Sequence, residues 1–332
     1  MLEFQARIAH RPSWLALPLA TLMCFGICIS PAAIADAYPS RPIKIVVPYA
    51  PGGGNDLLAR IFSEKLSARV GQPVLVDNKA GAAAILGTDL VAKSPPDGYT
   101  LLMAANGPIV FNPALYSQLP YSSTRDLVAI SIAGTFPLFL AVHENFPART
   151  LPELIAYSKA NPGKSNYSYP AASFQLIMEL LKSRSGLKAL NVPYQGAAPS
   201  IHAVLTGEVQ MTLIDSGPIA SLIKAGRLHG LAVTSEQRLP AFPEIPTLRE
   251  QGLDLAVYLW SGLFAPAGTP AEIVQRLQQE MVRIMGLPEV VERLQKLEIR
   301  AMGNTSAEFA AMITKEIELW SSVARANNIK AN

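Results

Sequence analysis

The chain has 332 residues, of which 50% are hydrophobic and 16% charged, so it can bury a sizeable core. Lys and Arg number 28 against 25 Asp and Glu, and these charges are spread along the chain. The absence of a basic block argues against a nucleic-acid-binding protein, and no fixed-period repeat or coiled-coil heptad run occurs.

The first 37 residues have the pattern of a cleavable signal peptide. Basic residues near the start precede an apolar run at 14–29, which is short for a membrane span of about 20 residues. Ala33-Ile34-Ala35 and Ala35-Asp36-Ala37 both fit the small-x-small rule for cleavage. We therefore expect residues 1–37 to be removed on export, with an uncleaved anchor as the alternative.

Both cysteines, Cys24 and Cys28, lie within this apolar run. The exported form would therefore have no disulfide, no thiol nucleophile and no Cys-based metal site. The sequence predicts a mature chain that is soluble in the periplasm and has the length of two domains.

The mature chain begins with a strand, a glycine-rich turn and a helix. β-Branched residues at 43–47 end at Pro48, three glycines follow at 52–54, and an apolar-periodic helix begins near Asn55. Free N–H groups and the helix dipole favour an anion at such a turn. The spacing fits neither a P-loop nor a dinucleotide site. We therefore predict a cradle for a small carboxylate, with a plain connecting turn as the alternative.

Strands and helices alternate along the rest of the chain, which predicts an α/β fold with mostly parallel sheets. Further strands are predicted at 73–77, 100–104, 131–133, 138–142, 209–214, 228–233 and 260–265, and a small-residue helix at 81–93. Thr-x-x-Glu capping boxes at Thr150, Thr269 and Thr305 predict helices at 151–161, 270–285 and 306–327.

Two strand-like segments, near 134–140 and 258–264, are candidate crossings between two lobes. We expect residues 38–137 and 262–332 to form a discontinuous lobe 1, and residues 138–261 to form lobe 2. Ligands of open α/β sheets bind beyond the carboxyl ends of the strands, which here means the cleft between the lobes.

Eight short motifs follow one another along the mature chain. They are Val-Pro-Tyr-Ala-Pro-Gly-Gly-Gly-Asn-Asp (47–56), Gly-Gln-Pro-Val (71–74), Pro-Asp-Gly-Tyr-Thr-Leu (96–101), Asn-Pro-Ala-Leu-Tyr (112–116), Ala-Asn-Pro-Gly-Lys (160–164), Val-Pro-Tyr-Gln-Gly (192–196), Pro-Glu-Ile-Pro-Thr (243–247) and Phe-Ala-Pro-Ala-Gly-Thr-Pro (264–270). In this order they resemble the Bug, or TctC-like, periplasmic solute-binding proteins. The resemblance implies a type II periplasmic-binding fold, in which two α/β lobes joined by two crossover strands close on a small carboxylate. It also implies delivery to the inner-membrane permease of a tripartite tricarboxylate transporter.

In that family, backbone groups and bridging waters from two turns of lobe 1 hold the ligand carboxylate. The residues of this chain that match the two turns are Tyr49, Ala50, Pro51, Gly52, Gly53, Gly54 and Asn55, and then Asn106, Gly107 and Pro108.

Lobe 2 departs from the commoner family pattern, because Tyr169-Pro170 replaces flexible residues. Ser173 is predicted to cap a helix whose N-terminus faces the cleft, which would bring Ala172, Ser173 and Phe174 to the ligand. Phe174 would favour a ligand with an apolar or ring portion, and an ordinary core position is the alternative.

Asp215 follows a predicted strand and matches a family position that contacts the variable end of the ligand. A carboxylate there would favour an amino or hydroxyl donor on the ligand. The alternative role, which is compatible with the first, is to cap the helix predicted at 217–225. Asp56 is expected mainly to stabilise the first turn of its helix.

The mature chain shows no catalytic motif. Its histidines lack zinc-ligand spacing, and neither Gly-x-Ser-x-Gly nor His-Glu-x-x-His occurs. We expect a monomeric binding protein, not an enzyme, without cofactor, metal or nucleic-acid partner. Its ligand could be an aromatic acid, a di- or tricarboxylate or an amino acid. A ligand-sensing subunit for a two-component sensor kinase is the alternative to a transport protein.

Overall fold

The computed structural model describes residues 38–331, and the predicted signal peptide lies outside this range. Within it, no helix combines the length and the hydropathy that a membrane crossing requires.

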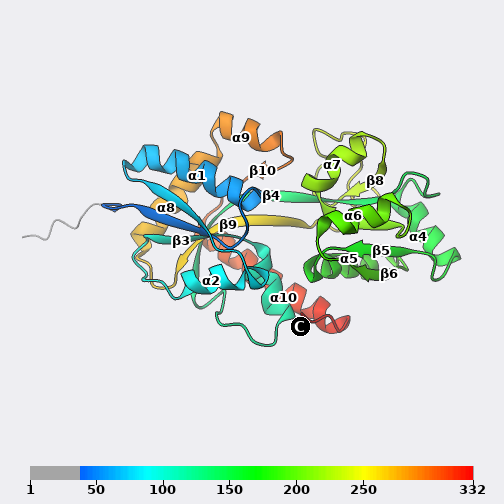
Figure 1. Cartoon of the computed structure of the whole chain (residues 1–332), viewed down its shortest axis with the longest axis horizontal. Helices are drawn as coiled ribbons and strands as arrows, with labels where there is room; N and C mark the ends of the chain where they lie inside the picture. Colours follow the sequence, from blue (N-terminus) through cyan, green and yellow to red (C-terminus); the bar gives the residue numbers. More distant parts are fainter. Residues whose placement is uncertain (1–37, 332) are drawn as a thin grey trace, which may run out of the picture. The chain divides into compact units, whose positions relative to one another are not determined.

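Ten strands form one mixed β-sheet (Figure 1). They are β1 (Ile43–Val47), β2 (Val74–Asn78), β3 (Thr100–Ala105), β4 (Leu127–His143), β5 (Asn166–Tyr169), β6 (Leu190–Pro193), β7 (Met211–Asp215), β8 (Leu228–Val233), β9 (Tyr258–Pro266) and β10 (Arg300–Ala301). The order is β2-β1-β3-β9-β4-β7-β5-β6, and β8 and β10 also pair with β4.

The expectation of mostly parallel sheets is wrong. β1 is parallel to β2 and β3, and β5 is parallel to β6 and β7, but β4 and β9 are antiparallel to their neighbours. The reason is that the chain runs along β4 into the second half of the sheet and returns beside it along β9 in the opposite direction.

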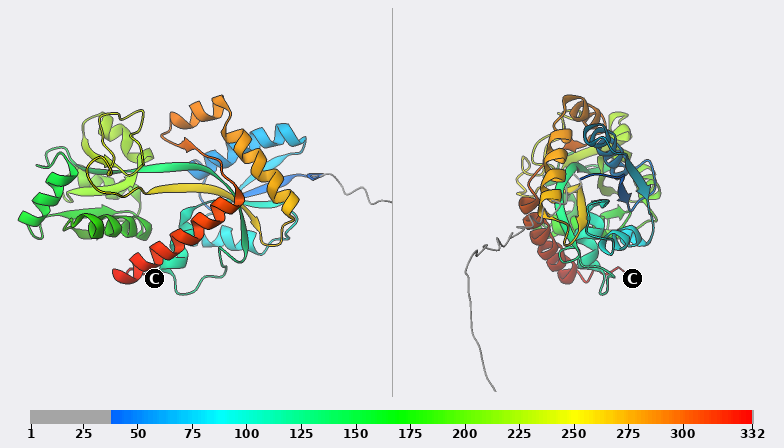
Figure 2. Two further views of the ribbon diagram at one scale, coloured as in Figure 1. Left: turned by 180° about the vertical axis from the view of Figure 1, so that it is seen from behind. Right: turned by 90° about the vertical axis from the view of Figure 1, so that its left-hand side faces the viewer.

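Helices cover both faces of the sheet. They are α1 (Gly54–Val70), α2 (Ile85–Ala92), α3 (Asn112–Leu115), α4 (Leu151–Ala160), α5 (Ala172–Ser185), α6 (Ala197–Leu205), α7 (Ser216–Lys224), α8 (Ala271–Met285), α9 (Pro288–Gln295) and α10 (Ser306–Ala326). One core packs α1, α8 and α9 against β1, β3 and β9 through residues such as Phe62 and Leu277. Another includes Trp260 and Trp320 and joins α10, red in Figure 2, to the opposite face. A third packs α6 and α7 against β4, β7 and β8.

β4 is one strand of 17 residues where the sequence predicts two shorter ones. Its register against β9 shifts at two places, which marks bulges that let the strand continue past Gly134. Up to Pro137 it pairs with β9, from Leu138 it pairs with β7, and from Phe139 it also pairs with β8. The pairing therefore changes at the residue where lobe 2 is predicted to begin, while the lobe boundaries themselves stay a prediction.

The three helices predicted from capping boxes are confirmed as α4, α8 and α10, but one of the boxes is wrong. At Thr305 both reciprocal bonds form with Glu308, at 3.2 and 2.9 Å. At Thr150 only the hydroxyl bond from the Glu153 N–H forms. The Thr269 hydroxyl instead donates to the Pro266 carbonyl at 2.8 Å, so Pro270 occupies the N-cap position of α8 without a side-chain cap.

The helix predicted at 81–93 begins only at Ile85. Ala82, Ala83 and Ala84 precede it in a 3₁₀ turn with φ values of 47°, 51° and 68°. This left-handed conformation is costly for any residue with a Cβ. A hydrogen bond of 3.0 Å from the Asn112 side chain to the Ala83 carbonyl helps to hold the turn.

Candidate functional site

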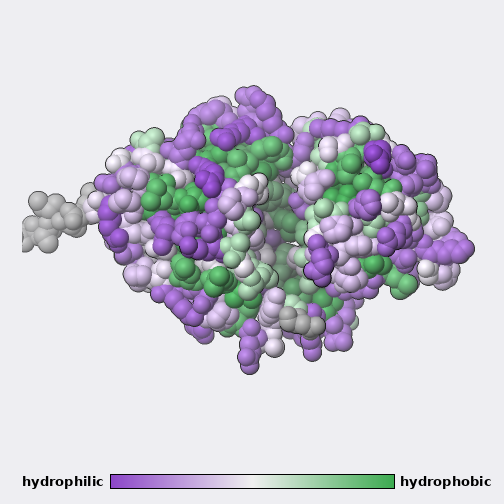
Figure 3. All heavy atoms as spheres, viewed as in Figure 1, coloured by the Kyte–Doolittle hydropathy of each residue, from purple (hydrophilic) through white to green (hydrophobic). Residues whose placement is uncertain are grey.

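A cleft of about 500 Å³ lies where the turn after β1 faces the start of α7. Figure 3 shows the surface hollowed between the parts that carry these two elements, with hydrophobic residues along the floor. The lining residues are Gly52, Gly53, Gly54, Asn55, Asp56, Leu57, Arg60, Ala105, Phe136, Asp215, Ser216, Gly217, Leu259, Leu297 and Ile299.

One wall of the cleft is the N-terminus of α1. Gly53 is the N-cap residue and makes no side-chain cap, and the first intrahelical bond runs from the Leu57 N–H to the Gly53 carbonyl at 3.0 Å. Within residues 38–331, nothing accepts the N–H groups of Gly53, Gly54 or Asn55. Because the helix dipole adds about half a positive charge at this end, this wall favours an anion.

The glycine turn has fewer free N–H groups than the sequence suggests. The Gly52 N–H donates to the Asp56 carboxylate at 2.9 Å, so the expectation that all three glycines offer free N–H groups is wrong. Gly52 has φ +92°, which favours glycine, whereas Gly53 has φ −82° and open space around a would-be Cβ. Gly53 is therefore the position where a side chain would enter the cleft without straining the backbone.

Asp56 holds this turn in place. Its carboxylate accepts from Gly52, from Arg60 Nε at 2.9 Å and from Asn78 Nδ2 at 3.0 Å. Burial disfavours the charged form, but the hydrogen bonds from Arg60, Gly52 and Asn78 outweigh it and hold the pKa of Asp56 below its ordinary value. Asp56 therefore fixes the conformation of the glycine turn, and these donors already compensate its negative charge.

The second predicted turn packs beside the first one. Ala105 lines the cleft, while Asn106 is buried and leads into a π-helical turn, Gly107–Phe111. Six of the predicted residues do not line the cleft: Asn106, Gly107, Pro108, Tyr49, Ala50 and Pro51. The Tyr49 hydroxyl lies 3.7 Å from a Cβ built on Gly107, so this side chain joins the two turns. The assignment of these six residues to the ligand stays a prediction.

The opposite wall is the start of α7. Asp215 ends β7 and occupies the N-cap position of α7, as the capping alternative predicts, but its side chain makes no capping hydrogen bond. Burial raises the pKa of this carboxyl group above its ordinary value. No side chain in the described part of the chain forms an ion pair or hydrogen bond with it. Asp215 thus presents to the cleft a partly buried carboxylate that, among the described residues, only its own backbone N–H favours in the charged form.

Phe136 lies between the two walls. A Cβ on Gly54 would come within 2.5 Å of its ring, so any other residue at the first position of α1 would displace Phe136. Phe136 precedes by two residues Leu138, whose partner in the β4–β7 ladder is Asp215. With Leu259, Leu297 and Ile299 it forms an apolar strip between the cradle and Asp215.

The start of α5 differs from the prediction in its N-cap residue and in its distance from the cleft lining. The helix begins at Ala172 with Ala171 as the N-cap residue, so Ser173 lies in the first turn and the prediction that it caps the helix is wrong. The Phe174 N–H already bonds to the Ala171 carbonyl at 3.0 Å, which starts the turn earlier than the sequence suggests. Phe174 is half-buried and packs against two hydrophobic cores. None of Ala172, Ser173 and Phe174 lines the cleft.

Sequence reasoning missed the apolar strip of the cleft. Leu297 and Ile299 follow α9 and carry no local signal, and Phe136 and Leu259 read as parts of strands. The sequence predicts a helix start near Ser216 and Gly217, but it does not predict that these two residues line the ligand cleft. Among residues 38–331, no group of three or more metal-ligating side chains comes together.

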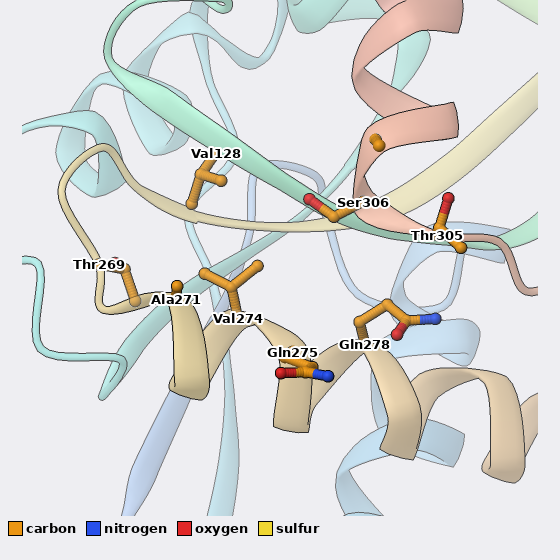
Figure 4. Close-up of a pocket in the computed structure, with 9 residues that line it drawn as sticks. Val128, Thr269, Ala271, Val274, Gln275, Gln278, Thr305 and Ser306 are labelled. Carbon is orange, nitrogen blue, oxygen red and sulfur yellow. The ribbon is translucent and has the colours of Figure 1, made fainter.

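A second hollow lies between the starts of α8 and α10 (Figure 4). All of its polar side chains except Gln275 already make hydrogen bonds within the protein. Gln278 donates to the Asn304 carbonyl at 3.1 Å, and Thr305 is part of the capping box of α10. We therefore assign the functional site to the cleft between α1 and α7.

Comparison with known proteins identifies the class. The family described as tripartite tricarboxylate transporter family receptor, TctC, matches residues 58–329. BugT of Bordetella pertussis is 34% identical over 318 residues, which cover 93% of this chain and 98% of that protein.

Two solved structures share the fold. Rpa4515 of R. palustris, solved with adipate, has a TM-score of 0.76 and 29% identity, covering 88% of this chain and 99% of that one. MatC from Rhodopseudomonas palustris, with bound malate, has a TM-score of 0.70 and 28% identity, covering 86% and 99%.

The fold and the cleft define a periplasmic solute-binding protein with two α/β lobes, as the sequence predicts. The chain belongs to the TctC family, which includes the Bug proteins.

Proposed function

We propose that this protein captures a small carboxylate in the cleft between α1 and α7 and delivers it to the permease of a tripartite tricarboxylate transporter. The observation that carries the proposal is the uncapped start of α1, where the amides of Gly53, Gly54 and Asn55 face the cleft without an acceptor. A carboxylate would accept from these amides and gain from the helix dipole.

The family assignment supports the delivery step, since the family is that of transporter receptors, and it gives no support to a kinase-sensing role. Export follows from the signal-peptide pattern of residues 1–37, so we place the mature protein in the periplasm. The cleft holds no metal-ligand cluster among the described residues, and we propose binding without catalysis.

Capture is tested by thermal-shift titration of residues 38–332, freed of co-purified ligand by unfolding and refolding. A ligand at 100 times its Kd adds about 2.7 kcal/mol to the free energy of unfolding and raises Tm by a few degrees. The corresponding amides should give no shift, because they lack the negative charge that the α1 terminus favours. If carboxylates and amides give equal shifts, the cradle is not the anchor.

The Gly53→Val substitution tests the position of the cradle. The isopropyl group would occupy the space above the α1 amides, so we expect at least a hundredfold loss of affinity, with Gly53→Ala intermediate. The backbone at Gly53 accepts any residue, so the Tm of the ligand-free variant should stay within a few degrees of wild type. Unchanged affinity in Gly53→Val would remove this turn from the site.

A further inference from the structure

The two walls of the cleft carry opposite polarity. The α1 wall offers amide N–H groups at the positive end of a helix dipole, whereas the α7 wall offers the carboxylate of Asp215. A ligand that touches both walls therefore meets donors at one end and an acceptor at the other.

In the described part of the chain, no cation is placed to neutralise Asp215. Arg60 lines the same cleft, but its guanidinium is engaged by Asp56 at 2.9 Å and by Asn78 at 3.3 Å on the α1 side. Within residues 38–331, Asp215 takes part in no salt bridge, and it is not used to cap α7. A partly buried carboxylate without a cationic partner loses some of its hydration, so a donor supplied by the ligand would offset that cost.

The strip between the walls is apolar. The ring of Phe136 abuts Gly54 on one side and lies two residues along β4 from Leu138, the ladder partner of Asp215. Leu259 and Ile299 line the same strip. These side chains offer nothing to screen a second negative charge on the ligand from the charge of Asp215.

We propose, building on the proposed function, that the ligand carries an ammonium or hydroxyl donor at the end opposite to its carboxylate, with an apolar middle, and that Asp215 selects for this donor. The same residue disfavours a second carboxylate at that end, because two negative charges would meet in a partly buried site. The preference is thus for amino or hydroxy acids over dicarboxylates, in contrast to the adipate held by Rpa4515.

The test uses ligand sets that differ only at the far end. One set is adipate, 6-aminohexanoate and 6-hydroxyhexanoate, and a second is succinate, 4-aminobutanoate and 4-hydroxybutanoate. An aromatic set is terephthalate, 4-(aminomethyl)benzoate and 4-hydroxybenzoate. Hexanoate, butanoate and benzoate report the carboxylate cradle alone. Affinities are measured by calorimetry on residues 38–332.

In the set that fits the cleft, we expect the amino or hydroxy acid to bind at least tenfold more tightly than the dicarboxylate. Asp215→Asn should abolish this preference. Asp254→Asn removes the same charge from a side chain that is 92% exposed, and it should leave the preference unchanged. The ligand-free Tm of each variant shows whether the fold is retained.

The outcomes separate this inference from the proposed function. If the dicarboxylate binds as tightly as the amino acid, or if Asp215→Asn keeps the wild-type preference, the role of Asp215 is overturned while carboxylate capture stands. If no member of any set binds, the monocarboxylates included, the carboxylate cradle fails and the inference fails with it.

Discussion

Glu316 is a largely buried carboxyl group on α10 that accepts a hydrogen bond of 3.0 Å from the indole N–H of Trp260 on β9. Burial raises its pKa from 4.5 to about 7, although the bond from Trp260 acts in the opposite direction. The folded protein therefore holds this proton more tightly than the unfolded chain. The free energy of unfolding therefore falls as pH rises from about 4.5 to about 7, and above that pH the loss levels off at about 3 kcal/mol.

Glu316→Gln should remove this penalty, because the glutamine oxygen still accepts from Trp260 and carries no charge. We expect the variant to have a free energy of unfolding about 2–3 kcal/mol higher than wild type at pH 8, with little difference near pH 4.5. Urea unfolding at both pH values measures it. Glu318→Gln, an exposed position on the same helix, serves as the control. A gain that is the same at both pH values would contradict this account.

Single residues also explain why the cradle could be predicted and its geometry could not. Three glycines before a helix are a local signal, visible in the sequence. That Asp56 takes the Gly52 N–H, and that Phe136 presses on Gly54, depends on side chains whose positions are set by packing.

Among the elements, the segment before α2 stores backbone strain. Ala82, Ala83 and Ala84 are all left-handed, and this costs an L-residue roughly 1–2 kcal/mol. The composition favours a helix over the whole segment, and the α-helix begins only after the strained turn.

Ala83→Gly should therefore stabilise the protein. Relief of the left-handed strain outweighs the roughly 0.5–1 kcal/mol that glycine adds to the entropy of the unfolded chain, so we expect a net gain of up to about 1 kcal/mol. Ala310→Gly, at an exposed position within α10, should cost about 1 kcal/mol. Chemical unfolding of both variants checks the opposite signs. A loss of stability in Ala83→Gly would show that the turn is not strained.

At the scale of the whole molecule, β4 and β9 join the two halves of the sheet, and the cleft draws residues from both halves. We propose that residues 38–137 with 262–332 and residues 138–261 move as two lobes about these strands. A ligand that contacts both lobes only when they are closed shifts the population to the closed state.

Ligand binding should therefore lower the radius of gyration measured by small-angle X-ray scattering. The tightest ligand of the calorimetric series is the probe, and Gly53→Val at the same ligand concentration should show no change. An unchanged radius of gyration in saturated wild type would argue for a cleft that is already closed around its ligand.

The sequence by itself determined the features that depend on neighbours along the chain. The capping box at Thr305, the strand at 43–47 and the glycine turn before α1 each rest on bonds or steric limits within a few residues, so they could be predicted. The collinear motifs likewise identified the family, because a family pattern is written along the chain.

Only the tertiary structure decided three features. They are the direction of the central strands, the absence of a side-chain partner for Asp215 among the described residues, and the apolar strip of the cleft. Phe136, Leu259 and Ile299 are far apart in sequence, and they meet because β4 and β9 pair over their lengths and the segment after α9 folds back beside β4. Strand register and side-chain packing are long-range, so a local pattern carries little information about them. The α1 wall of the cleft could thus be predicted from the sequence, whereas the apolar strip between the two walls could not.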